Sequence, residues 1–146
     1  MFVFSLQSVL DYRNNIEEKI HGEFSEKKRE LEIEELKLIN LINEVANLID
    51  ELRKMQNKPL PVDDIARCVV YVEQVRENEK KQRITIAQVA EQLAAKRNEL
   101  LEAVKKRKIM EKLKERHTEE CIIAARALEQ KNSDEMAVLK FGRREK

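Results

Sequence analysis

The sequence predicts an all-α protein: a long antiparallel two-helix coiled coil, or helical hairpin, with an overhanging C-terminal helix. The 146 residues include only two Gly and two Pro, so few positions suit chain reversals. Apolar residues recur at alternating intervals of three and four, the spacing of a coiled-coil seam. Charged residues make up 39% of the chain, yet 29 basic side chains nearly balance 28 acidic ones, as on solvated helix faces. These features argue against sheets, barrels and Gly-rich phosphate-binding loops.

The first helix is predicted over residues 4–56, where apolar residues fall on two adjacent heptad rows. One row holds Leu6, Ile20, Leu41, Leu48 and Met55. The other holds Val3, Leu10, Phe24, Leu31, Leu38, Val45 and Leu52. Polar residues interrupt the rows at Arg13, Glu17, Lys27 and Glu34.

A turn is predicted over residues 57–62. Pro59 and Pro61 each lack a backbone donor and disfavour helical backbone in the residue before them, so the first helix ends there. Asp63 and Asp64 follow at once, and carboxylates stabilise the first turn of a helix.

The second helix is predicted over residues 63–140, with a frayed tail at 141–146, which makes residues 1–146 a single coiled-coil domain. One of its rows holds Ile65, Val72, Ile86, Leu93, Leu100, Cys121 and Leu128. The other holds Cys68, Val75, Val89, Ala103, Met110, Ala124 and Val138.

Folding the chain at the prolines predicts the register of the two helices. At 1.5 Å per residue the helices are about 80 Å and about 115 Å long. A short connection makes them antiparallel neighbours, and the residue numbers of facing positions then sum to about 120. Residue 3 is therefore expected beside residue 117, and roughly the last two dozen residues are expected to extend beyond the first helix.

The cysteines and histidines do not predict an enzyme, a cofactor or a metal site. Cys68 and Cys121 are about 80 Å apart on one straight helix, too far for a disulfide, and are interpreted as small apolar seam residues. The register places His21 opposite residue 99 and His117 opposite residue 3, so the two imidazoles cannot meet. A two-helix coiled coil also offers no pocket that excludes water.

A basic segment occupies the second helix from Lys96 to Arg116, with nine basic and four acidic residues, including Lys105, Lys106, Arg107 and Lys108. Two interpretations stay open: a solvated helix face, or a docking surface for an acidic protein. Nucleic acid is not predicted as a partner, because no aromatic residues are interleaved for stacking on bases.

Eight consecutive polar residues, Arg76 to Arg83, interrupt the apolar seam of the second helix, whereas the facing stretch of the first helix, near residues 36–44, is strongly apolar. The apolar side chains either form a partner site or are buried by rotation or splaying of the helices.

Tyr71, Val75, Asn78 and Gln82 recur at intervals of four, three and four, so they line one face of the second helix. Tyr71 lies one position off the seam, which predicts a partly exposed interface anchor. The alternative is that its ring covers the flank of the coil against Met55 or Leu52.

No apolar run approaches the roughly 20 residues that span a bilayer, so membrane insertion is not expected. Met1–Leu6 lacks the basic flank and cleavage site of a secretory signal. Two lone cysteines fit a reducing cytoplasm.

Residues 2–13, Phe-Val-Phe-Ser-Leu-Gln-Ser-Val-Leu-Asp-Tyr-Arg, resemble the start of the flagellar export protein family FliJ. The segment Val69–Val75 resembles the aromatic-centred stretch of that family, although relatives often have glutamines where this chain has Val69 and Val70. Chain length and the division into two helices agree with the resemblance, which covers essentially the whole chain.

The resemblance implies an antiparallel coiled coil similar to the central stalk, the gamma subunit, of F-type rotary ATPases. It implies a cytoplasmic, non-catalytic protein without cofactors, located peripherally at the cytoplasmic face of the inner membrane. The implied partners are the hexameric flagellar export ATPase, the membrane protein of the export gate and export chaperones, with a role in flagellum biogenesis, motility and chemotaxis.

On this basis Lys105–Lys108 and Arg116 are expected to face the ATPase. The face formed by Tyr71, Val75, Asn78 and Gln82, which we call the Tyr71 stripe, is expected to face the gate. Two other functions stay open: the equivalent stalk of a virulence type III secretion system, and a structural coiled coil that self-assembles through residues 36–49.

Overall fold

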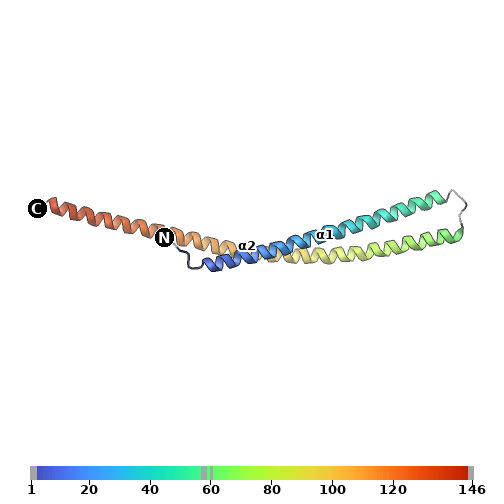
Figure 1. The fold of residues 1–146 in the computed structure, drawn as a ribbon, viewed down its shortest axis with the longest axis horizontal. Helices are drawn as coiled ribbons and strands as arrows, with labels where there is room; N and C mark the ends of the chain where they lie inside the picture. The colour runs from blue at the N-terminus through green and yellow to red at the C-terminus, as the bar shows by residue number, and fades with distance from the viewer. Residues whose placement is uncertain (1–2, 57–58, 60, 145–146) are drawn as a thin grey trace. The chain divides into compact units, whose positions relative to one another are not determined.

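The computed structural model describes residues 3–56, 59 and 61–144. Two helices account for nearly all of this part of the chain: α1, Gln7–Met55, and α2, Val62–Arg144 (Figure 1). The helices pack together in opposite directions, and the described residues include no strand. The predicted all-α helical hairpin is confirmed.

Both helices differ from their predicted bounds at the ends. α1 begins at Gln7, not residue 4, and the Gln7 amide donates a hydrogen bond to the carbonyl of Phe4 at 3.1 Å. α2 begins directly after Pro61, whose carbonyl accepts a hydrogen bond from the Asp64 amide at 3.1 Å. Of the predicted turn, residues 57, 58 and 60 lie outside the described residues.

α2 continues to Arg144, past residue 140 where the sequence predicted its end, and fraying of the tail stays a prediction. The only weak helix former there is Gly142, and one glycine costs a helix about 1 kcal/mol, which is too little to end it. Residues 145 and 146 lie outside the described part of the chain.

Tertiary contacts divide the chain into two units. The hairpin unit comprises Lys19–Leu100, and the terminal unit comprises Met1–Glu18 together with Leu101–Lys146. Each unit is described by itself below. That the two units unfold together as the single predicted domain stays a prediction.

The core of the hairpin unit lies where the end of α1 packs against the start of α2. Val45, Val72 and Val75 are buried, and four partly buried side chains of α1 pack around them. These four are Leu41, Leu48, Ile49 and Leu52. All but Ile49 lie on the predicted seam rows, so the heptad pattern identified this core.

The rest of the hairpin seam contains polar layers. Gln82 of α2 donates hydrogen bonds to the backbone carbonyl of Glu34, at 2.9 Å, and to its carboxylate. Lys96 pairs with Glu23 at 2.8 Å, and Lys27 donates to the side chain of Gln92 at 2.9 Å. Polar groups at seam positions favour one register over others, because another register would leave them without partners.

In the terminal unit, Phe4, Leu10 and Ala103 are buried. The Phe4 ring packs edge-on against His117, with the ring centroids 5.7 Å apart, and Lys114 donates to the side chain of Gln7 at 2.8 Å. Phe4 therefore holds the non-helical start of the chain against α2.

The cross-helix pairs follow the predicted register within each unit to within five residues. In the hairpin unit the residue numbers sum to 115 for Glu44–Tyr71, 116 for Glu34–Gln82 and 119 for Lys27–Gln92. In the terminal unit they sum to 121 for Gln7–Lys114 and 124 for Glu17–Arg107. The expected sum was about 120.

Residues 119–143 of α2 are all exposed, and we call this segment the overhang. Cys121, Ala124, Leu128 and Val138 continue the seam rows of α2 but are exposed. The heptad pattern places these side chains on the face of α2 that forms the seam, but no part of α1 covers them. The predicted overhang is confirmed.

Candidate functional site: partner-binding surfaces

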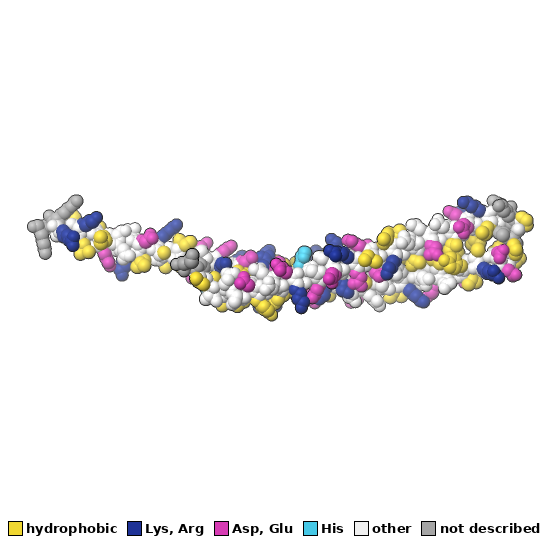
Figure 2. Space-filling model, in the orientation of Figure 1, with side chains coloured by type: hydrophobic (Ala, Val, Ile, Leu, Met, Phe, Trp, Pro, Cys, Tyr) yellow, Lys and Arg dark blue, Asp and Glu magenta, His cyan; other side chains and the backbone are white. Residues whose placement is uncertain are grey.

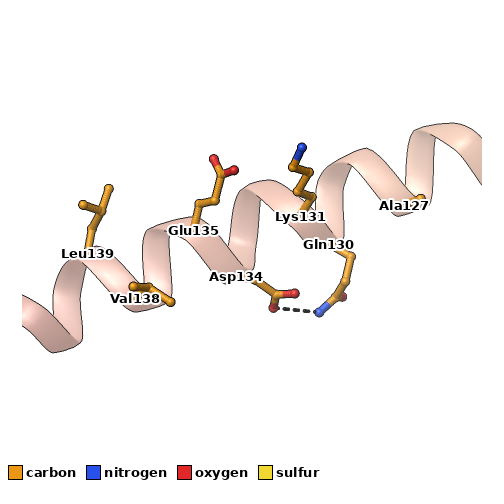
Figure 3. Close-up of a pocket in the computed structure, with 7 residues that line it drawn as sticks. All are labelled: Ala127, Gln130, Lys131, Asp134, Glu135, Val138 and Leu139. Carbon is orange, nitrogen blue, oxygen red and sulfur yellow. Dashed lines mark hydrogen bonds between the residues drawn. The ribbon is translucent and has the colours of Figure 1, made fainter.

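The hollows on the described surface are shallow. One hollow lies along the overhang, and Figure 3 shows its lining side chains standing on a single helix, with Gln130 donating a hydrogen bond to Asp134 at 3.1 Å. An open helix face of this kind cannot exclude water from a bound small molecule. The candidate sites are therefore surfaces for macromolecular partners.

Among the described residues, no group of three or more His, Cys, Asp or Glu side chains could hold a metal ion. Neither helix contains, within those residues, an apolar stretch long enough to cross a membrane.

The four Cys and His residues occupy different environments. Cys68 is a partly buried seam residue with a free thiol, as expected, whereas the free Cys121 lies on a seam row but is exposed on the overhang, so its interpretation as a core residue is wrong. His21 is exposed, and His117 is half-buried against Phe4.

The basic segment is mostly solvent-exposed. Lys105 is 70% exposed and, within the described part of the chain, pairs only with Glu102 on the same helix, at 3.4 Å. Lys106, Lys108 and Arg116 are also exposed. With Lys105 they form what we call the basic surface, on the part of α2 that belongs to the terminal unit.

Arg107, which the sequence grouped with these residues, instead lies in the seam. Its guanidinium donates to Glu17 of α1 and to Glu111 at 2.7 Å. Hydrogen bonds to Glu111 and then to Glu17 raise the pKa of Arg107 above its usual value. Arg107 lies in the seam because its heptad position, seven residues after Leu100, turns the side chain toward α1. Arg107 is therefore a register-setting residue and not an accessible contact.

Tyr71 is 46% exposed, in agreement with its place beside the seam. Its hydroxyl donates to the carboxylate of Glu44 at 2.6 Å, and this hydrogen bond raises the pKa of Tyr71 above 10.0. The polar end of the ring is thus fixed to α1, while nearly half of the side chain faces solvent.

The other three residues of the Tyr71 stripe divide between core and surface. Val75 is only 3% exposed within the core, and Gln82 binds Glu34 across the seam. Asn78 is exposed. Val75 and Gln82 are therefore not available to a partner, because both lie on the row that packs against α1.

Sequence reasoning missed an exposed apolar surface at the start of α2. Val70 is 63% exposed and lines a shallow hollow with Tyr71, while Val62 and Val69 are 80% and 45% exposed on the other flank of α2. We call these four residues the hairpin-end surface. Figure 2 shows hydrophobic side chains gathered over this end of the hairpin unit. The adjacent valines were a usable signal, because one helix face cannot bury two consecutive side chains equally well.

The apolar side chains of residues 36–42 of α1 are divided between the seam and the solvent-exposed surface. Leu38 and Leu41 are partly buried in the seam, whereas Leu36, Ile39 and Ile42 are 58%, 53% and 41% exposed. The helices do not rotate or splay enough to cover the second group.

Comparison with protein families now adds to this geometry. The family model described as "Flagellar FliJ protein" matches residues 1–146. The chain belongs to the flagellar FliJ protein family. The resemblance stated from residues 2–13 and 69–75 is thereby confirmed.

One solved structure similar to this FliJ-family chain is a YscO homologue, CT670, from Chlamydia trachomatis. The TM-score is 0.62 at 24% sequence identity, over 95% of this chain and 94% of that chain. At this identity the likeness supports the two-helix fold. No curated protein matches the chain.

Family membership makes the chain a stalk-like protein related to type III export. The geometry agrees with such a role, because its candidate sites are exposed helix faces at separate places along the chain.

Proposed function

We propose that this FliJ-family chain is the central stalk of the flagellar type III export apparatus. In this role it binds the export ATPase hexamer, the membrane protein of the export gate and export chaperones. It has no catalytic activity of its own. It works in the cytoplasm, peripherally at the cytoplasmic face of the inner membrane, and it is needed for motility and chemotaxis.

The observation that carries the proposal is the overhang. Apolar side chains such as Ile123, Met136, Leu139 and Phe141 are 57–66% exposed there on one unpaired helix. A helix that packs against nothing has little stability of its own in water. The overhang therefore suits a partner that surrounds it, and the pore of a hexameric ring is such a partner.

The basic surface supports the same placement, because it lies on the helix that continues into the overhang. Exposed positive charges steer a protein toward acidic loops and mainly increase the association rate. Lys105, Lys106, Lys108 and Arg116 are the proposed ATPase-facing residues. Arg107 supports them only indirectly, by fixing the seam.

Charge reversal tests this contact. The triple variant Lys105→Glu, Lys106→Glu and Lys108→Glu should associate with the ATPase ring several-fold more slowly and lose most of the salt dependence of association. Reversal of Lys80 and Lys81, which are exposed in the hairpin unit, is the matched control. If the two variants affect ring binding equally at low salt, the basic surface is only a solvated helix face and the proposed contact is wrong.

The gate contact is proposed for the hairpin-end surface, with Tyr71 as its anchor and Asn78 beside it. Tyr71→Ala should reduce binding to the gate protein and swimming at unchanged protein level. Tyr12→Ala is the matched control, because Tyr12 is 59% exposed in the terminal unit. Normal swimming of the Tyr71→Ala strain at normal abundance would contradict the contact.

A second candidate function is the equivalent stalk of a virulence type III secretion system, and the similarity to a YscO homologue favours it. Complementation separates the two candidates. The flagellar stalk should restore swimming to a strain that lacks its own FliJ-family protein, and it should not restore secretion to an injectisome mutant.

A further inference from the structure

A second heptad row runs along α1 in the hairpin unit, separate from the seam. Ile39, Ile42, Ala46 and Ile49 follow one another at intervals of three, four and three. Ile39 and Ile42 are 53% and 41% exposed, Ala46 is exposed, and Ile49 is half-buried because it also packs against the core of the hairpin unit. The row lies about 100° around the helix from the row that packs on α2, so α2 leaves most of it uncovered.

Charged residues continue this row at both ends, with opposite signs. Glu35 precedes Ile39 by four positions, and Arg53 follows Ile49 by four. Both charged side chains are exposed. The row therefore reads acidic, apolar, basic along α1, and we call it the second seam.

This order makes the second seam complementary to itself when two copies run antiparallel. Two-fold symmetry centred between Ile42 and Ala46 places Ile42 of one copy opposite Ala46 of the other, and Ile39 opposite Ile49. The same symmetry places Glu35 of each copy opposite Arg53 of the other. A parallel arrangement would instead bring like charges together at both ends, which is unfavourable.

We propose that the second seam binds a second copy of this chain in an antiparallel, two-fold symmetric dimer. Every layer of the interface then joins an apolar pair or an opposite-charge pair. The short row buries less than the roughly 800 Å² per partner of a standard stable complex, so the dimer is reversible. The proposal is independent of the export function, because none of its residues belongs to the basic surface, the hairpin-end surface or the overhang.

Sedimentation of the full chain over a hundredfold range of concentration tests the dimer, which should dissociate on dilution. Ile39→Asp should weaken association at least tenfold, because it places two carboxylates in the apolar layers. Ile33→Asp is the matched control, because Ile33 is 55% exposed on α1 but lies off the second seam. Circular dichroism should show unchanged helicity in both variants, because both positions are exposed.

Charge exchange tests the antiparallel direction. Glu35→Arg alone and Arg53→Glu alone should each weaken self-association, because each places like charges opposite one another. An equimolar mixture of the two variants should associate again as a heterodimer, since each arginine then faces a glutamate. A chain that stays monomeric throughout, a mixture that stays dissociated, or equal damage by Ile33→Asp and Ile39→Asp would each overturn the proposal. These results leave the assays of ring and gate binding unaffected.

Discussion

Phe4 and His117 pack edge to face, with ring centroids 5.7 Å apart and ring planes at 69°. Phe4 lies before α1 and is only 5% exposed, so this pair ties the start of the chain to α2 in the terminal unit. Aromatic pairs of this geometry contribute about 1 kcal/mol beyond the area that they bury.

Phe4→Ala should therefore loosen the first turns of α1 without unfolding the hairpin unit. Amide hydrogen exchange should accelerate at least several-fold over residues 7–12, because the local opening loses both the burial and the aromatic pair. Val3→Ala is the control, since Val3 is 79% exposed. Equal exchange in the two variants would contradict the role of Phe4.

Arg107 and Lys106 are neighbours in sequence, but their substitutions should differ in effect. Arg107→Leu should lower the melting temperature, because it leaves the partly buried Glu17 without its cross-helix partner. Lys106→Leu should change it little. The double variant Glu17→Leu with Arg107→Leu should recover the loss, since an apolar pair can replace an ion pair in a seam. Thermal melts followed by circular dichroism compare these three variants with the unchanged chain.

Leu93→Ala should lower the free energy of unfolding by about 2 kcal/mol, the lower end for a buried leucine, because the two-helix seam is partly open. Leu101→Ala should change it by less than about 0.5 kcal/mol, because Leu101 is 51% exposed. If the chain is one domain, as its sequence predicts, urea unfolding should follow a single transition. If both variants lose the same free energy of unfolding, the predicted register is wrong.

Acid should destabilise the hairpin unit through Glu34 and Glu23. A hydrogen bond from Gln82, and then one from Lys37, lowers the pKa of Glu34 below 4.5, and Lys96 lowers that of Glu23 in the same way. Between the two sets of pKa values, the carboxylates of Glu34 and Glu23 bind more protons in the unfolded chain than in the folded one. Their contribution to stability is therefore fully present above the pKa values of the unfolded chain, and it is lost as the pH falls through the lower pKa values of the folded protein. The melting temperature should therefore fall with pH in this range. Glu34→Gln should make that fall shallower, whereas Glu35→Gln, as an exposed control, should not.

The pKa of Tyr71 should lie above its usual value, because the hydrogen bond to Glu44 favours the protonated phenol. Ultraviolet titration of a Tyr12→Phe variant isolates Tyr71, since the chain has only two tyrosines. Glu44→Gln should lower the measured pKa toward 10.0. By linkage, this contact stabilises the fold at neutral pH, and its contribution is lost as pH rises through the folded pKa. A pKa that is unchanged by Glu44→Gln would show that the contact does not persist in solution.

Several features of the fold could be predicted from the sequence. Heptad spacing gave the buried faces, including Val45, Val72 and Val75, and the two prolines gave the place where the chain reverses. A short connection leaves antiparallel helices few possible registers, and pairs such as Phe4–His117 match the expected one. The opening residues 2–13 also pointed to the correct family.

The candidate site was predicted less well. The sequence grouped Arg107 with the accessible lysines and Val75 with the gate-facing residues, but both side chains face α1. Their heptad positions already implied this, so the error came from weighing local charge and spacing above seam position. The exposure of Val62, Val69 and Val70 was not predicted, although all three lie off the seam rows of α2.

The sequence by itself determined which residues form helices, where the chain reverses and which side of each helix is apolar, because propensity and periodicity are local properties of a chain. Only the tertiary structure decided which of those apolar sides are covered. Ile42 and Ile49 lie seven residues apart on one row beside the seam of α1, yet Ile42 is 41% exposed whereas Ile49 is half-buried and packs against the core. Burial beside the seam depends on how closely the facing side chains of α2 approach, and the packing of the two helices sets that distance.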